Sequence, residues 1–107
     1  MIWKKSKDKK VLSPAPGIEA QSMAFGDSLH ILQFHIKKGA LMPTHSHPQE
    51  QAGYLLQGKM IMTIDGVDHE IDAGDAWAIK GNVPHSVRVI EDGSIIEVFS
   101  SIRHDYM

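Results

Sequence analysis

Apolar residues in this chain gather in short runs that are separated by frequent turn signals. Glycine next to Asp, Asn, Lys or Gln recurs along the chain, and this punctuation favours short strands over helices. No convincing amphipathic helix is found. The runs between the signals are mostly rich in β-branched or aromatic residues, and they predict strands over residues 29–37, 53–57, 59–64, 67–71, 76–79, 83–90 and 94–99.

The strongest local signal is the Asp65-Gly66 pair between two apolar runs. It predicts a β-hairpin, because these residues supply the positive φ angles of a two-residue hairpin turn. Seven or eight strands in so short a chain would leave exposed edges in an open sheet. A closed barrel or jelly roll avoids those edges, so we expect one all-β domain that covers residues 1–107.

Composition narrows the class of protein. The chain has no cysteine, and no apolar run approaches the roughly 20 residues that a membrane-spanning helix needs. Its basic start lacks the apolar stretch of a secretory signal, so we expect a cytoplasmic protein with no membrane partner. The body of the chain offers no cluster of basic and aromatic residues, so nucleic acid is not expected as a partner either.

The first twelve residues differ from the rest in charge. They hold five of the eleven basic residues, and Trp3 stands among these lysines. A lysine run is usually a solvated tail, whereas a tryptophan favours burial against the barrel or a second subunit. We expect residues 1–12 to form a basic tail or a strand exchanged with a second copy, and the chain to form a homodimer.

The residues that can carry chemistry concentrate between Gly39 and Gln51. Side chains alternate between the two faces of an extended strand. His45 and His47 therefore point the same way, and Gln51 continues that phase while Glu50 faces the opposite side. Two imidazoles that converge on one point suit a divalent transition metal.

A further ligand has to come from another strand, and His85 is the candidate because it follows a glycine and proline turn. A chance His-x-His pair is an open alternative in a chain with seven histidines. Glu50 replaces Gln51 as the ligand if Pro48 breaks the strand phase. The framing of the histidines by glycine and proline favours a site.

The spacing of these residues resembles that of the cupin motifs. The first motif is matched by Gly39, His45-Ser-His47, Gln51 and Gly58, with glutamine where glutamate is usual. The second motif is matched by Gly74-Asp75 and Asn82-Val83-Pro84-His85, with departures at Lys80 and Val89.

This resemblance implies an all-β cupin, a double-stranded β-helix or jelly-roll barrel. It also implies one divalent transition metal (Ni, Zn, Fe, Mn or Cu), with the ligands His45, His47, Gln51 and His85.

A closer resemblance involves the run from His45 to Gln51, Val98-Phe99-Ser100 and the C-terminal Arg103-His104-Asp105-Tyr106. These runs are similar to small KdgF-type cupins of pectin and alginate breakdown, which open the ring of 4,5-unsaturated uronate monosaccharides to give linear keto sugars. The resemblance implies a sugar-acid substrate. It also implies substrate-binding roles for Phe99 and Arg103 and catalytic roles for Arg103 and Glu97, although Glu97 stands where an aspartate is expected.

The chemistry of the residues is compatible with that function. Three neutral imidazoles and an amide leave the full charge on a metal ion, which favours Lewis-acid work. Arg103 could pair bidentately with a carboxylate, and Glu97 could carry a proton if burial raises its pKa. The alternatives are a surface Arg103, an outward-facing Glu97 and a Phe99 that only packs in the core.

Two other functions stay open. One is a metal-dependent dioxygenase that acts on a small organic substrate, and the other is a barrel that binds a small ligand without changing it. The remaining histidines lack comparable framing, and we expect hydrogen-bonded or solvated side chains at His30, His35, His69 and His104.

Overall fold

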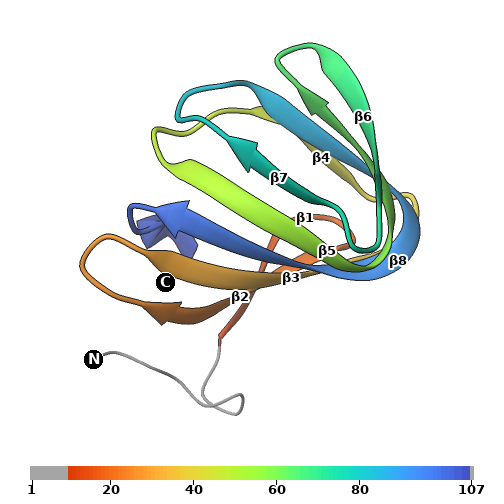
Figure 1. Cartoon of the computed structure of the whole chain (residues 1–107). Coiled ribbons are helices and arrows are strands. Elements are labelled where there is room, and N and C mark those ends of the chain that lie inside the picture. The colour runs from red at the N-terminus through yellow and green to blue at the C-terminus, as the bar shows by residue number, and fades with distance from the viewer. Residues whose placement is uncertain (1–9, 107) are drawn as a thin grey trace.

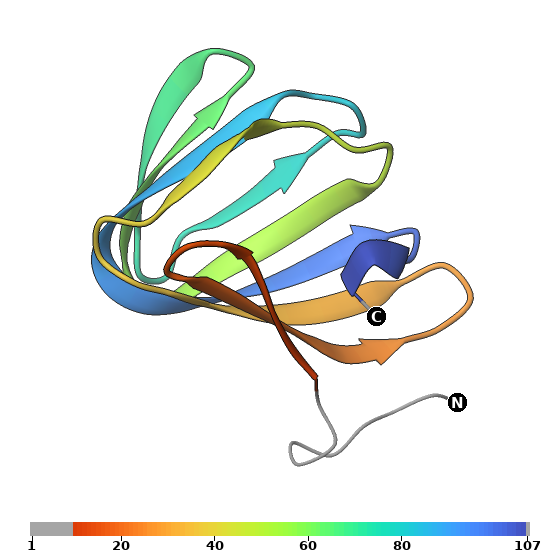
Figure 2. The same cartoon turned by 180° about the vertical axis from the view of Figure 1, so that it is seen from behind.

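The computed structural model describes residues 10–106, and strands make up most of them. Figures 1 and 2 show these strands curling around a common interior. The predicted all-β fold is therefore confirmed. The elements are β1 (Val11–Ala15), β2 (Ile18–Phe25), β3 (His30–Ile36), β4 (Leu41–His45), β5 (Glu50–Ile64), β6 (Val67–Asp72), β7 (Ala76–Ile79), β8 (His85–Ser100) and a C-terminal 3-10 turn (His104–Tyr106).

Two long strands organise the barrel. The sheet order is β1-β2-β3-β8-β5-β6, with β4 added to β8 and β7 added to β5. β5 and β8 pair from Glu50 opposite Ser100 to Ile64 opposite His85, and both curve strongly (Figure 1). Near Glu50 the pair is flanked by β3 and β7, whereas near Ile64 it is flanked by β4 and β6. One strand pair thus belongs to both layers of the barrel.

The curve lies where two glycines face each other. A Cβ atom at Gly58 would lie 2.7 Å from the carbonyl oxygen of Asp92, and one at Gly93 would overlap the carbonyl oxygen of Gln57. Register shifts on both sides of Gln57 form a β-bulge that bends the pair. The predicted breaks at these glycines are therefore wrong, because each glycine permits a close crossing within a continuous strand.

The remaining strand predictions differ in outcome. The hairpin is confirmed, with φ angles of 49° at Asp65 and 80° at Gly66, and the ranges 67–71 and 76–79 lie in β6 and β7. The sequence analysis missed β1, β2 and β4. β1 and β4 each contain a proline, and β2 contains Gln, Ser and two alanines, so these runs carry weak strand propensity and pairing with neighbouring strands decides their structure.

Residues 1–9 of the predicted tail or exchanged strand, Trp3 among them, lie outside the described residues. Val11 and Leu12 pair with Gln21 and Ala20 of the same chain. The exchanged strand and the homodimer stay predictions. In the part of the chain from 10 to 106, no helix is long and apolar enough to cross a membrane.

Inward-facing side chains close the barrel and determine where polar groups lie. Leu32, Leu55, Met60 and Val89 are almost completely buried. Five polar or charged residues of the strands and one of the C-terminal segment are buried with them, which requires hydrogen-bonded partners. They are Ser22, His30, Gln51, His85, Glu97 and Arg103.

Candidate metal centre

Three of the predicted ligands meet inside the barrel. His45 is the last residue of β4 and lies opposite His85, the first residue of β8. His47 lies in the connection between β4 and β5. One ring nitrogen from each histidine lies within 4.8 Å of the other two, so this group could hold a metal ion.

Backbone carbonyl groups fix the orientation of all three rings. The Nδ1 atom of His45 donates to the carbonyl of Pro43 at 2.8 Å, and that of His85 donates to Val83 at 2.8 Å. His47 Nδ1 donates to the carbonyl of Gln49 at 2.9 Å. A carbonyl accepts only, so each Nδ1 carries the proton and each Nε2 keeps a free lone pair. These bonds provide the outer shell that metal-binding histidines use.

The glycine and proline framing has a structural reason. A Cβ atom at Gly81 would overlap the carbonyl oxygen of Pro48, so only glycine lets these two loops touch. The N–H of Asn82 then donates to the carbonyl of His47 at 2.7 Å. These contacts tie the loop before His85 to the loop that carries His47.

Gln51 turns its amide oxygen away from a buried carboxylate. Its Nε2 donates to Oε2 of Glu97 at 3.1 Å. Its Oε1 is buried without a hydrogen-bond partner, and so is Nε2 of His47. Buried acceptors without a partner are costly, so two such atoms beside the histidines fit a bound cation. The donor set is compatible with a divalent transition metal.

A tryptophan holds the carboxylate that orients Gln51. Nε1 of Trp77 donates to Oε1 of Glu97 at 3.2 Å. Gly53 lies between these two residues in the sheet, opposite Trp77 on β7 and opposite Glu97 on β8. A Cβ atom at Gly53 would overlap the indole. The glycine therefore lets the ring lie across β5 and reach the carboxylate.

Burial shifts the pKa values of this group in opposite directions. It lowers the pKa of His85 to about 4. Burial, with the charge of Arg103, also lowers the pKa of His47. It raises the pKa of Glu97 to about 7, against the hydrogen bonds from Trp77 and Gln51. The His85 imidazole thus stays neutral in mildly acidic solution, and Glu97 can exchange a proton near neutral pH.

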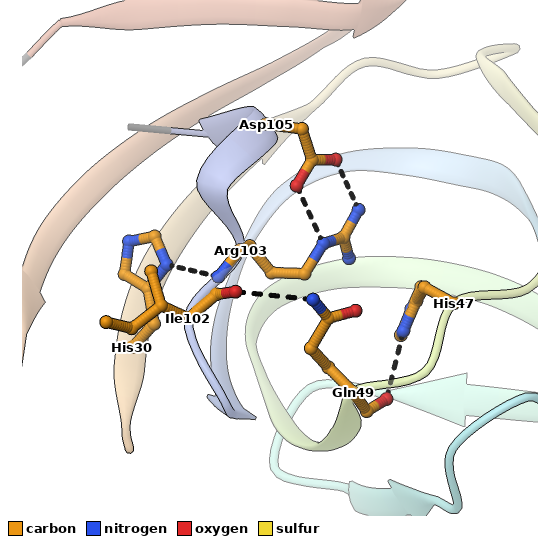
Figure 3. A network of polar contacts seen from close by, with 6 residues as sticks. All are labelled: His30, His47, Gln49, Ile102, Arg103 and Asp105. Atoms are coloured by element: carbon orange, nitrogen blue, oxygen red, sulfur yellow. Dashed lines mark hydrogen bonds and ion pairs between the residues drawn. The ribbon is translucent and has the colours of Figure 1, made fainter. Parts of the chain in front are cut away.

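Arg103 is a buried residue, which excludes a surface position. Its Nε and Nη2 atoms donate to Oδ1 and Oδ2 of Asp105 at 3.0 and 2.7 Å. Its guanidinium carbon lies 4.8 Å from the ring centroid of Phe99 and 4.7 Å from that of Tyr106. Figure 3 shows Arg103 and Asp105 together with His47.

All the predicted site residues line one cavity of about 60 Å³. The lining includes eight residues that the sequence analysis did not assign to the site, among them Ile95 and Tyr106. Met42 and Met62 are further apolar residues of this lining. The predicted site residues in this lining are His45, His47, Gln51, His85, Glu97, Phe99 and Arg103.

Alternation along one strand does not by itself place Gln51 on the same side as His45 and His47. β4 ends at His45 and β5 begins at Glu50, so no single strand joins the motif. Gln51 is nevertheless buried while Glu50 is exposed, which removes Glu50 as the alternative ligand. The sequence analysis missed Trp77, although its alternation with Ile79 on one face of a predicted strand was a usable signal.

The family model of the cupin domain matches residues 32–104, which is more than half of the chain. The chain belongs to the cupin family. This cupin is 31% identical over 93 residues to the pectin degradation protein KdgF of Dickeya dadantii, and the match covers 85% of this chain and 84% of that protein.

Solved cupin structures share the fold over nearly the whole chain. An RmlC-like cupin from Shewanella frigidimarina superposes with a TM-score of 0.89 at 25% identity, covering 98% of this chain and 95% of that one. KdgF from Halomonas superposes with a TM-score of 0.87 at 24% identity, covering 98% and 97%. The jelly-roll fold expected from the sequence motifs is confirmed.

Proposed function

We propose that this cupin opens the ring of 4,5-unsaturated uronate monosaccharides to give linear keto sugars, with a divalent metal bound by His45, His47, Gln51 and His85. The observation that carries the proposal is the pair of buried acceptors, Gln51 Oε1 and His47 Nε2, that lack a partner beside the other two imidazoles. The similarity to a pectin degradation protein supports this substrate class.

The donor set favours non-redox chemistry. Among residues 10–106, the group that could hold a metal contains three histidines and no carboxylate. A metal bound there would supply a Lewis acid that stabilises negative charge on a sugar-acid oxygen. Non-haem iron oxygenases, in contrast, add an anionic carboxylate to two histidines.

The other residues of the cavity bind the substrate and move a proton. Arg103 binds the uronate carboxylate, a partner that its planar fork suits. The sugar ring packs beside Phe99. In the reaction the C1 hydroxyl loses its proton as the bond from C1 to the ring oxygen breaks, and C4 gains a proton as the C5 ketone forms. Glu97 carries a proton between these positions, for which a pKa of about 7 is suitable.

The test follows the ultraviolet absorbance of a freshly generated unsaturated galacturonate monomer, corrected for its spontaneous loss. We expect purified protein to accelerate the loss, and we expect chelator-stripped protein and Gln51→Ala to show no acceleration. His69→Ala, a change at an exposed histidine, is the matched control and stays active. Activity that survives both metal removal and Gln51→Ala would refute the proposal, and oxygen consumption during turnover would identify a dioxygenase instead.

A further inference from the structure

The C-terminal turn restricts the Arg103 side chain in a way that its burial alone does not explain. Arg103 has a side-chain exposure of 9%, whereas its partner Asp105 is 60% exposed. The aromatic rings of Phe99 and Tyr106 both lie against the guanidinium. These two rings fix the plane of the guanidinium, and the carboxylate of Asp105 fixes its rotation within that plane.

Asp105 occupies one edge of the guanidinium and leaves another edge available. It accepts from Nε and Nη2. A guanidinium has five N–H groups, so two N–H groups of Nη1 and one of Nη2 have no bond to Asp105. These groups form the end-on fork that binds a carboxylate bidentately. In Figure 3, Asp105 and His47 lie on different sides of the guanidinium.

The turn that carries Asp105 is itself anchored to the barrel. The backbone N–H of Arg103 donates to Nδ1 of His30 at 3.1 Å, and Nε2 of Gln49 donates to the carbonyl of Ile102 at 3.2 Å. The ring of Tyr106 packs edge-on against Phe34 with a centroid distance of 5.8 Å. Asp105 therefore holds Arg103 from a fixed position.

We propose that Asp105 is a positioning residue that makes Arg103 present its Nη1/Nη2 edge to the carboxylate of the ligand. This inference rests on the proposed function, in which Arg103 binds the uronate carboxylate. A simpler role would be that of a counter-charge, and the two roles predict opposite effects. Removing a counter-charge strengthens the binding of an anion. Removing a positioning partner weakens it, because two buried N–H donors lose their acceptor and the side chain reorients.

The two effects of Asp105 on ligand binding, repulsion of the ligand carboxylate and orientation of Arg103, differ in strength. Asp105 is exposed to solvent, so its repulsion of a ligand carboxylate is weak. Its two hydrogen bonds to a buried guanidinium are charge-assisted, and such bonds are strong and directional. The positioning effect is therefore the larger one.

The experiment compares the binding of D-galacturonate with that of its neutral methyl ester to the zinc-loaded full-length chain, by isothermal titration calorimetry or ligand-observed NMR. We expect Asp105→Asn to weaken binding of the acid about tenfold, which corresponds to about 1.4 kcal/mol, and to leave binding of the ester unchanged. Unchanged ester binding shows that the pocket is still folded. Asp72→Asn is the matched control, because it breaks an exposed ion pair with Lys59.

Three outcomes would overturn the inference: tighter binding of the acid by Asp105→Asn, unchanged acid binding, or a wild-type protein that does not prefer the acid to the ester. A pocket that collapses in Asp105→Asn would weaken both ligands, and Asp105→Glu, which retains the carboxylate, should then restore the preference for the acid. Failure of that rescue also counts against positioning. These measurements need no turnover, so the inference can hold when ring opening is not observed, and ring opening can be observed when the inference fails.

Discussion

Two kinds of buried histidine occur in this barrel. The ring of His30 is completely buried and both of its nitrogens are bonded, since Nδ1 accepts from the backbone of Arg103 and Nε2 donates to Ser22 at 2.7 Å. His85 is also buried, but its hydrogen bond within residues 10–106 runs from Nδ1 to the carbonyl of Val83. The same residue type therefore serves as a structural clamp in one place and as a candidate ligand in another. Burial does not distinguish them, but the partner of the second nitrogen does.

The largest expected effect is the loss of the candidate metal centre in His85→Ala. A structural zinc site contributes about 10–16 kcal/mol over four ligands, so removing one ligand should weaken metal binding by at least about a hundredfold. Calorimetric titration with Zn²⁺ or Ni²⁺ measures this effect. His69→Ala is the control and should bind as the wild type does. Equal metal affinity in His85→Ala and in the wild type would remove the distinction between the two kinds of histidine.

The second effect is a loss of stability in His30→Ala. This change removes two buried hydrogen bonds and leaves a cavity, so the free energy of unfolding should fall by about 2 kcal/mol. Urea unfolding measures this value. Ser22→Ala, which removes one of the two bonds, should cost less. The metal stoichiometry should stay that of the wild type, and a loss of metal binding without unfolding would contradict a purely structural role.

The smallest effect is the pH dependence of stability in the metal-free protein. Unfolded His85 gains a proton below pH 6.5, whereas the folded residue does so only near its pKa of about 4. Its contribution to stability is therefore present above pH 6.5 and is lost as the pH falls toward 4. Glu97 acts with the opposite sign. Its folded pKa is about 7, so its contribution is present below pH 4.5 and is lost as the pH rises through 7.

Variants separate the two contributions to this pH dependence. Thermal unfolding between pH 4.5 and 6.5 should show that Glu97→Gln loses more stability on acidification than the wild type. His85→Gln should lose less, with differences on the order of 1 kcal/mol. Identical profiles for all three proteins would show that these two groups do not titrate as their burial indicates.

Local sequence signals predicted the parts of the molecule that depend on short-range geometry. The Asp65-Gly66 hairpin depends on two φ angles, and the framing of His85 depends on a loop that only Gly81 permits. Local signals could not predict the orientation of Gln51. Its amide is held by Glu97, which lies 46 positions later in the chain, and Glu97 is in turn held by Trp77.

Glycines were the least predictable feature of the sequence. Gly58 and Gly66 both have positive φ angles, of 100° and 80°. Gly58 lies inside the continuous strand β5, whereas Gly66 lies in the turn of the hairpin between β5 and β6. Only the carbonyl that approaches Gly58 from β8 distinguishes them, and a partner that lies more than 30 residues away leaves no local trace. Long-range pairing therefore explains why the two predicted strand interruptions, at Gly58 and at Gly93, are wrong.

The shared pair of long strands also has a consequence for the order in which the barrel forms. β5 cannot complete either layer until β8 has been synthesised, and the contact between His30 and Arg103 joins residues 73 positions apart. Folding dominated by such distant contacts is slow, in the range of milliseconds to seconds. During synthesis the edges of β3 and β5 that pair with β8 have no partner, so the emerging chain is most prone to aggregation just before β8 leaves the ribosome.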